Sequence, residues 1–262
     1  MTILDKILEN KKAEVENQKK LCSFEKLINK CENLPETKSF LRTLEKNREN
    51  NKITLIAEVK KASPSKGVIK EDFNHVEIAK TYQKAGASAI SVLTDEKFFQ
   101  GSVQYLKDIK KIIEIPVLRK DFIIDEYQIY QTKEMGADII LLIASALEKT
   151  QLKDFYRISK ELGLDVLLEI HDKAELDFAM EINADIIGIN NRNLKTFEVN
   201  LHHTIDLIKD TKLNNKYIIS ESGIKTFKDV SLLKSYNVAG ILVGESILKS
   251  INIEKSVLDL LK

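Results

Sequence analysis

Five apolar segments in different parts of the chain end in charged or amide side chains. They span residues 55–60, 116–120, 165–169, 186–192 and 217–223. A strand buried in a parallel sheet is a nearly unbroken run of Val, Ile and Leu, and an unpaired charge beside it would be costly to bury. When several parallel strands carry such groups at their carboxyl ends, those ends can converge on one site. The pattern therefore predicts an active site built from strand ends.

The side chains at these ends have the types needed for acid–base chemistry on an anionic substrate. Alternate residues of a strand face the same side. The predicted mouth therefore receives carboxylates, lysines, an amide and a guanidinium, from Glu58, Lys60, Lys120, Glu169, Asn190, Arg192 and Glu221. Nearby cations would lower the pKa of Lys120, and Arg119 and Lys60 are placed to exert this effect. An enclosed mouth would raise the pKa of a glutamate and make it a better proton acceptor.

The ends of the last two predicted strands favour phosphate binding. Gly223 and Gly244 follow them, and glycine lets backbone N–H groups approach an anion, as at the corresponding loops of many barrels. Lysines also crowd the loop after the first strand, at positions 60, 61, 66 and 70, which suits an anionic small molecule. We expect residues 61–67 of that loop to close over the substrate.

A repeat of strand and helix positions these groups. The predicted strands are 53–60, 88–94, 116–121, 138–144, 165–170, 185–190, 216–221 and 239–244. Each is followed by apolar residues at helical spacing, and Gly86, Gly136 and Gly163 stand just past three predicted helices, where a left-handed residue ends a helix. Eight alternating units predict an α/β fold, a (β/α)8 TIM barrel over 53–262. An open doubly wound sheet would have fewer strands and a glycine-rich first turn.

Residues 1–52 precede the repeat and are predicted to form an N-terminal helical extension. One apolar stripe at helical spacing lies within 3–8, and a second lies within 24–31. The segment is too short to hold a core of its own, so we expect it to pack on the barrel. Residues 45–52, rich in charged and amide side chains, are the predicted solvated connection. The whole chain, 1–262, is thus expected to be a single domain.

The composition excludes several classes of function. The 262 residues include 41 Lys and Arg and 40 Asp and Glu, a net charge of +1, whereas nucleic-acid binders show a basic excess. No apolar run approaches the ~18 residues of a membrane span, and the first residues have no basic region followed by a long apolar core, so we expect no secretion signal. Cys22 and Cys31 are the only cysteines, and no metal-binding spacing occurs. We therefore expect a cytoplasmic protein with no metal, cofactor, nucleic-acid partner or membrane contact.

The four histidines add little to the predicted chemistry. His75 stands at a predicted helix start, and His202 and His203 open the helix after the sixth strand, so we expect them at the surface. His171 follows Glu169 by two positions and faces the same side. We expect it behind the catalytic groups rather than among them.

Motifs at the strand ends resemble the indole-3-glycerol-phosphate synthase family. They are I-A-E-V-K-K-A-S-P-S-K-G at 56–67, L-R-K-D-F at 118–122, L-L-E-I at 167–170, G-I-N-N-R-N-L at 188–194, S-E-S-G-I at 220–224 and V-G-E-S at 243–246. The resemblance covers essentially the whole chain, the helical extension included. It implies a monofunctional lyase of tryptophan biosynthesis, which converts 1-(2-carboxyphenylamino)-1-deoxyribulose 5-phosphate to indole-3-glycerol phosphate. Carbon dioxide and water are lost, and no cofactor or metal is required.

The resemblance also implies roles for individual residues. Lys120 would be the general acid that protonates the ketone oxygen, and Glu169 its partner in the later dehydration. Glu58 and Lys60 would assist proton transfer, with Lys60 also meeting the substrate carboxylate. Asn190 and Arg192 would contact the substrate hydroxyls, and Glu221 would complete the polar wall. The aromatic ring would lie against Pro64, Phe122 and Leu141. The phosphate would be bound by Ser63, Gly223, Gly244 and the backbone of Glu245, with Leu194 and Ser222 beside the substrate.

Other barrel enzymes fit these strand ends less well. Phosphoribosylanthranilate isomerase would require a cysteine where Glu58 stands, and a Schiff-base aldolase would place its lysine at Asn190. Histidine-pathway barrels would use aspartates on opposite strands. The alternatives are another phosphate-binding barrel enzyme, or a catalytically inactive barrel that acts as a binding protein. We expect a monomer that takes a small phosphorylated substrate and associates at most weakly with other tryptophan-pathway enzymes.

Overall fold

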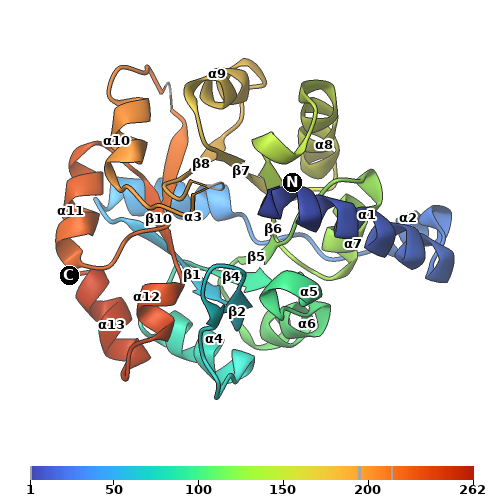
Figure 1. Ribbon diagram of the computed structural model, residues 1–262, viewed down its shortest axis with the longest axis horizontal. Coiled ribbons are helices and arrows are strands. Elements are labelled where there is room, and N and C mark those ends of the chain that lie inside the picture. The colour runs from blue at the N-terminus through green and yellow to red at the C-terminus, as the bar shows by residue number, and fades with distance from the viewer. Residues whose placement is uncertain (1, 194–195, 214) are drawn as a thin grey trace.

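A closed barrel of parallel strands forms the centre of the molecule (Figure 1). The structure, a computed structural model, describes residues 2–193, 196–213 and 215–262. The barrel strands are β1 (Thr54–Val59), β4 (Ala89–Leu93), β5 (Val117–Lys120), β6 (Ile139–Ile143), β7 (Asp165–Ile170), β8 (Ile186–Asn190), β9 (Tyr217–Glu221) and β10 (Gly240–Val243). Because β1 pairs with both β4 and β10, the sheet has no free edge. The predicted (β/α)8 barrel is confirmed, with every strand within one residue of its predicted limits.

Helices cover the outside of the barrel and alternate with its strands (Figure 1). They are α4 (His75–Lys84), α6 (Val103–Ile112), α7 (Glu126–Glu134), α8 (Lys149–Glu161), α9 (Lys173–Glu181), α10 (His202–Ile208), α11 (Phe227–Ser235) and α13 (Ile253–Leu260), with the short α5 (Glu96–Phe99), α12 (Glu245–Leu248) and 3-10 turn η1 (Ala144–Ala146). Asp125 caps α7 and Thr226 caps α11, each through a reciprocal capping box that satisfies N–H groups left free at a helix start. Gly136, just past α7, has φ of 82°, as predicted for a helix-ending glycine.

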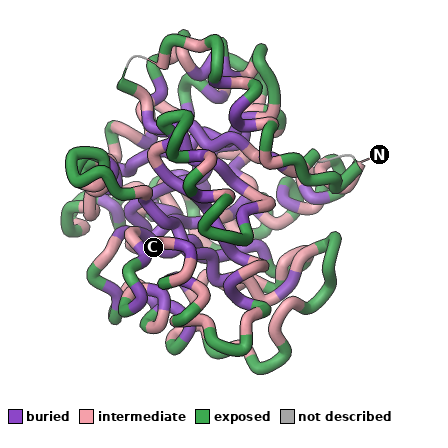
Figure 2. Tube along the Cα trace, turned by 90° about the vertical axis from the view of Figure 1, so that its left-hand side faces the viewer, coloured by how far each residue is buried: buried purple, intermediate pink, exposed green. Residues whose placement is uncertain are grey.

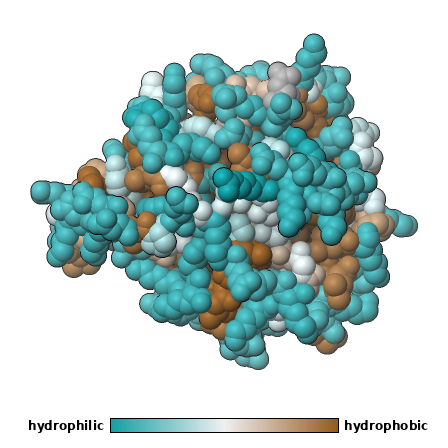
Figure 3. All heavy atoms as spheres, turned by 180° about the vertical axis from the view of Figure 1, so that it is seen from behind, coloured by the Kyte–Doolittle hydropathy of each residue, from teal (hydrophilic) through white to brown (hydrophobic). Residues whose placement is uncertain are grey.

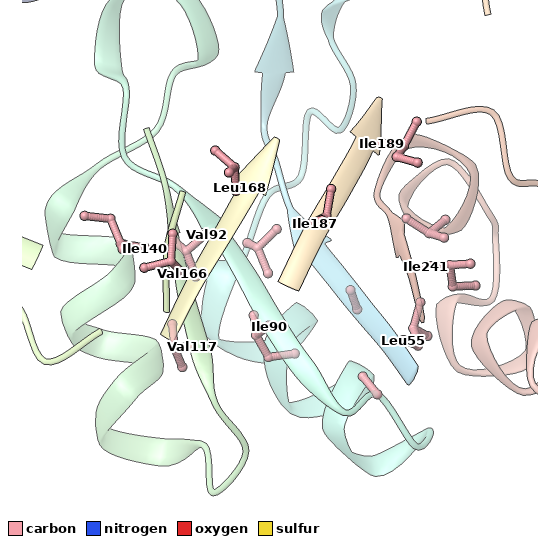
Figure 4. Close-up of a cluster of buried hydrophobic side chains, with 14 of the residues drawn as sticks. Leu55, Ile90, Val92, Val117, Ile140, Val166, Leu168, Ile187, Ile189 and Ile241 are labelled. Carbon is pink, nitrogen blue, oxygen red and sulfur yellow. The ribbon is translucent and has the colours of Figure 1, made fainter. Parts of the chain in front are cut away.

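Two apolar layers hold the strands in place. Strand residues that point outward pack on the surrounding helices, as Ile90, Val166 and Ile187 show in Figure 4. Alternate residues point inward and fill the barrel, among them Leu118 and Leu167. Buried residues accordingly concentrate at the centre of the molecule (Figure 2). The charged side chains lie next to this core, at the carboxyl ends of the strands.

The N-terminal extension forms α1 (Ile3–Leu21), α2 (Phe24–Cys31) and α3 (Phe40–Glu49). Helix α3 closes the amino-terminal end of the barrel, because Phe40 is fully buried in the inner core and its N–H donates to Asp165 at 2.6 Å. Residues 45–52, the predicted solvated connection, are exposed except for the half-buried Asn47, and α3 runs through them as far as Glu49. Their charged side chains are solvated on the outer face of that helix.

Helix α1 lies in front of the barrel strands in Figure 1 and is fixed there by a buried lysine. The Nζ of Lys11 is 3.0 Å from Asp95 and 2.9 Å from Asp121, and all three side chains are almost completely buried. Asp121 directly follows β5, so this ion-pair cluster connects the extension to the carboxyl end of the barrel.

The loop after β1 folds back on itself. Two short strands, β2 (Ala62–Ser63) and β3 (Gly67–Val68), pair in an antiparallel hairpin.

The face of the molecule opposite to that in Figure 1 is mostly hydrophilic, with separate apolar patches (Figure 3). Among the described residues no helix is long and apolar enough to cross a membrane, and none group into a cluster of acidic, His and Cys ligands that could hold a metal ion.

Candidate active site

A cavity of about 900 Å³ opens at the carboxyl ends of the barrel strands. Fifteen of the sixteen predicted site residues line it, and the sixteenth, Leu194, lies outside the described residues. The lining includes Glu58, Lys60, Ser63, Pro64, Lys120, Phe122, Leu141, Glu169, Asn190, Arg192, Glu221, Ser222, Gly223, Gly244 and Glu245. The structure therefore brings together side chains that are far apart in the sequence.

Lys120 lies between two buried carboxyl groups. Its Nζ is 2.8 Å from Glu169 Oε2 and 3.2 Å from Glu221 Oε2. These partners come from β7 and β9, while Lys120 ends β5, so the contacts cross the barrel. A second ion pair on β1 joins Lys60 to Glu58. These ion pairs bring Lys120 and Lys60 together with the carboxyl groups of Glu58, Glu169 and Glu221.

The expectation of a lowered pKa for Lys120 is wrong. Burial alone would lower this pKa, but the charges of Glu169, Glu221 and Glu58 outweigh it and raise the pKa above its ordinary value. Arg119 cannot oppose them, because neighbouring strand residues face opposite sides. Its guanidinium lies outside the barrel, where it donates to Asp121 at 3.0 Å.

The two carboxyl groups beside Lys120 have opposite pKa shifts. Burial acts to raise the pKa of Glu169, but Lys120 and His171 outweigh it and hold the pKa well below its usual range. For Glu221, burial prevails over Lys120, and together with the charge of Glu169 it raises the pKa to about 7. When two neighbouring carboxyl groups have different pKa values, one can act as a proton donor and the other as a proton acceptor.

Asn190 and His171 explain part of this difference. The Asn190 amide donates to Glu169 Oε1 at 3.1 Å, and His171 Nε2 lies 3.4 Å from the same oxygen. The corresponding oxygen of Glu221, Oε1, is buried and has no hydrogen-bond partner among the described residues. Hydrogen bonds and cations favour the charged form of a carboxyl group, so Glu169 is ionised more readily than Glu221.

The end of the cavity next to β9 and β10 is lined by small residues and cations. Gly223 has φ of 86°, and Ser222 before it has φ of 69°, so the chain after β9 turns sharply at the cavity wall. The Glu245 carboxylate is paired with cations, because Lys249 Nζ lies 2.8 Å from it and the Arg192 guanidinium 4.0 Å. Lys66 and Lys225 also line this end.

Gly244 leaves room for a neighbouring carboxyl group. A Cβ at this position would stand 2.6 Å from Glu58 Oε2, so the Glu58 carboxyl would have to move to make room for it. Because Gly244 has no side chain, the Glu58 carboxyl can occupy its position, and the backbone beside Gly244 is open to the cavity.

A family comparison agrees with this geometry. The family model described as indole-3-glycerol phosphate synthase matches residues 4–260. The chain belongs to the indole-3-glycerol phosphate synthase family.

Individual relatives are similar over nearly their full length. The chain is 49% identical to the indole-3-glycerol phosphate synthase of Thermoanaerobacter pseudethanolicus over 260 residues, 99% of this chain and 97% of the relative. It is 46% identical to that of Neisseria meningitidis serogroup C, with 97% of each chain covered. Among solved structures, thiamine phosphate pyrophosphorylase from Pyrococcus furiosus has a TM-score of 0.60 at 15% identity, over 81% of this chain and 95% of that chain. This last likeness shows the fold alone.

Sequence reasoning missed one wall of the site in this member of the indole-3-glycerol phosphate synthase family. Ile3, Leu4 and Ile7 of α1 line the cavity together with Phe122 and Leu141. The apolar stripe within 3–8 predicts packing on the barrel and gives no sign of a place in the cavity. Its partners are more than a hundred residues away in the sequence, and local spacing carries no information about them.

Proposed function

We propose that this protein is an indole-3-glycerol phosphate synthase, which closes the indole ring of 1-(2-carboxyphenylamino)-1-deoxyribulose 5-phosphate with loss of carbon dioxide and water. The observation that carries the proposal is the position of Lys120 between Glu169 and Glu221 in the mouth cavity. One ammonium group between two carboxyl groups of unequal pKa suits a reaction with several proton transfers at neighbouring atoms. Family membership supports the same reaction.

Lys120 is the proposed general acid for ring closure. As the ring carbon that bears the carboxylate attacks the ketone carbon, the ketone oxygen takes a proton from the Lys120 ammonium. The raised pKa of Lys120 keeps the ammonium charged before the step. Carbon dioxide then leaves the attacked ring carbon, and its bonding electrons restore the aromatic ring.

Glu169 and Glu221 serve the dehydration in this proposal. The new hydroxyl takes a second proton and leaves as water, and a proton is then removed from the adjacent carbon to complete the indole. Glu169 is the proposed partner for these transfers, since it contacts Lys120 and has Asn190 as a donor. Glu221, with a pKa of about 7, completes the polar wall in either protonation state.

The substrate is proposed to lie along the cavity with its aromatic ring at the apolar wall. Phe122, Leu141, Pro64 and helix α1 provide that wall. Lys60 would meet the substrate carboxylate, and Asn190 and Arg192 the sugar hydroxyls. The phosphate would lie at the opposite end, among Ser63, Ser222, Gly223, Gly244 and the backbone of Glu245, with Lys225 adding positive charge. Every proposed step uses side chains of this chain.

The absence of tryptophan from the sequence makes a direct test possible. Adding the substrate to the folded protein should produce indole absorbance and fluorescence against a low protein background. A folded protein that binds the substrate but forms no indole product would instead support the alternative of an inactive barrel that acts as a binding protein.

A further inference from the structure

The proposed reaction takes up one proton from solvent in each turnover. The substrate carboxylate leaves as neutral carbon dioxide, and its electron pair stays on the ring. The ketone oxygen gains two protons before it leaves as water, while only one proton is released from carbon. The active site must therefore be supplied with a net proton, although the bound substrate covers the side of Lys120 that faces the cavity.

A second group of ionisable side chains lies behind Glu169, on the side away from Lys120. Glu169 Oε2 faces Lys120, and Oε1 faces His171, whose Nε2 is 3.4 Å away. The other ring nitrogen, Nδ1, is 3.6 Å from Glu175 Oε2. Exposure of the side chains rises along this row, from 4% for Glu169 to 17% for His171 and 20% for Glu175. The row thus leads from the reaction centre toward solvent.

The His171 ring is held in this position from two helices. Glu175 at the start of α9 accepts the backbone N–H of His171 at 2.6 Å. His203 of α10 contacts the His171 carbonyl oxygen through Nε2 at 2.8 Å. Glu169, Glu175 and His203 are therefore the titratable groups that face His171 from its own strand and from both neighbouring helices. Both ring nitrogens are buried, and each has a carboxylate oxygen beside it, from Glu169 at Nε2 and from Glu175 at Nδ1.

We propose that His171 supplies the net proton of each turnover to Glu169, and that Glu175 keeps the His171 ring charged and connected to solvent. The inference rests on the proposed function, because only that reaction creates the demand for a proton. In the step, the Nε2–H bond of the imidazolium breaks and an O–H bond forms on Glu169, which leaves a neutral imidazole. The ring regains a proton from solvent beside Glu175 before the next turnover.

The charge state of the ring agrees with this role. Burial would lower the pKa of His171, but Glu169 and Glu175 outweigh it and raise the pKa to about 10. The ring is therefore protonated throughout the neutral range. Its proton can pass to Glu169 once Lys120 has given its own proton to the substrate, because a neutral Lys120 no longer holds the pKa of Glu169 low. Loss of the Glu175 charge should lower this pKa, because a nearby anion stabilises the imidazolium.

The test compares His171→Gln and Glu175→Gln with the unaltered protein and with His202→Gln, an exposed histidine on α10. For His171→Gln we expect kcat at pH 8 to fall about 10-fold to 100-fold, near the lower end of the ~10²–10⁴-fold typical of acid–base residues. KM should stay within about twofold, and added imidazole should restore part of kcat. For Glu175→Gln, we expect the alkaline limb of the kcat profile to move to lower pH. His202→Gln should match the unaltered protein.

Unchanged kcat in both variants, or a loss that is constant with pH and not restored by imidazole, would overturn the role of His171. If His171→Gln does not fold, the shifted alkaline limb of Glu175→Gln still decides the question. If the unaltered protein forms no indole product, the proposed function fails and the proton supply fails with it. Product from the unaltered protein with unshifted variant profiles overturns the proton supply alone.

Discussion

Replacing Lys120 by methionine tests the centre of the proposed mechanism. Methionine keeps most of the side-chain volume but removes the ammonium that lies 2.8 Å from Glu169 and 3.2 Å from Glu221. Loss of a general acid typically lowers kcat ~10²–10⁴-fold, which corresponds to about 3–5 kcal/mol at 1.36 kcal/mol per tenfold. Substrate binding should survive, because the apolar wall and the phosphate end of the cavity are untouched.

The same substitution has a stability effect whose pH dependence can be derived. Breaking a buried ion pair costs about 3–5 kcal/mol when the partner stays charged. Without the ammonium, the pKa values of both glutamates rise, and Glu221 already has a pKa of about 7. A carboxyl group with a raised pKa in the folded state supports folding fully below its unfolded value and loses that support as pH rises through the folded value. The loss of stability in the variant should therefore be smaller near pH 5 than at pH 8.

Single-turnover formation of indole fluorescence, with urea denaturation at both pH values, measures the two effects separately. Lys153→Met, an exposed lysine on α8, is the matched control and should change neither. A Lys120→Met protein that keeps most of its single-turnover rate would refute the assignment of Lys120 as the acid. An equal loss of stability at pH 5 and pH 8 would refute the electrostatic account of the cluster.

Three further predictions concern residues around the centre. Gly244→Ala should lower kcat/KM by up to about 10²-fold, because its Cβ would displace the Glu58 carboxyl and misplaced catalytic groups lose rate steeply; steady-state kinetics that match the unaltered protein would contradict this. Lys11→Met should lower the free energy of unfolding, measured in urea at pH 7, by about 3–5 kcal/mol, because Asp121 stays buried but loses one of its cationic partners. A decrease below about 1 kcal/mol would mean that the Lys11 ion pairs do not stabilise the packing of α1 on the barrel. Amide hydrogen exchange across 61–70 should slow when a product analogue binds, because the lysines of this loop repel one another without an anion; equal exchange in both states would identify the hairpin as a fixed turn.

The barrel could be predicted from the sequence because its signals are local. Each strand is a short apolar run, and several of the helices are followed by a residue with positive φ, as Gly136 and Asn183 illustrate. The site residues followed from the same local signal, since a charge at a strand exit is visible without knowledge of the partner. The closed order of the strands then brings these exits together.

The electrostatics of the site could not be predicted in the same way. Arg119 is the nearest cation to Lys120 in the sequence, yet it points to the other side of the sheet and binds Asp121. The groups that set the pKa of Lys120 come from β7 and β9, about fifty and one hundred residues further along the chain. Their approach depends on the stagger of the strands around the barrel, which residue spacing within one strand does not encode.

The contrast between Glu169 and Glu221 shows how the barrel gives one residue type two chemical states. Both are buried glutamates at strand exits, and both contact the same Lys120 ammonium. Gly188, the strand-pairing partner of Glu169, has no side chain, and a Cβ there would overlap Glu221 Oε1. The glycine therefore leaves space for Glu221 Oε1, which has no hydrogen-bond partner among the described residues, whereas Asn190 and His171 contact Oε1 of Glu169 and stabilise its charge. The difference in pKa arises from these neighbours, so substitutions at Gly188, Asn190 or His171 should alter proton transfer although none of them removes a glutamate or the lysine.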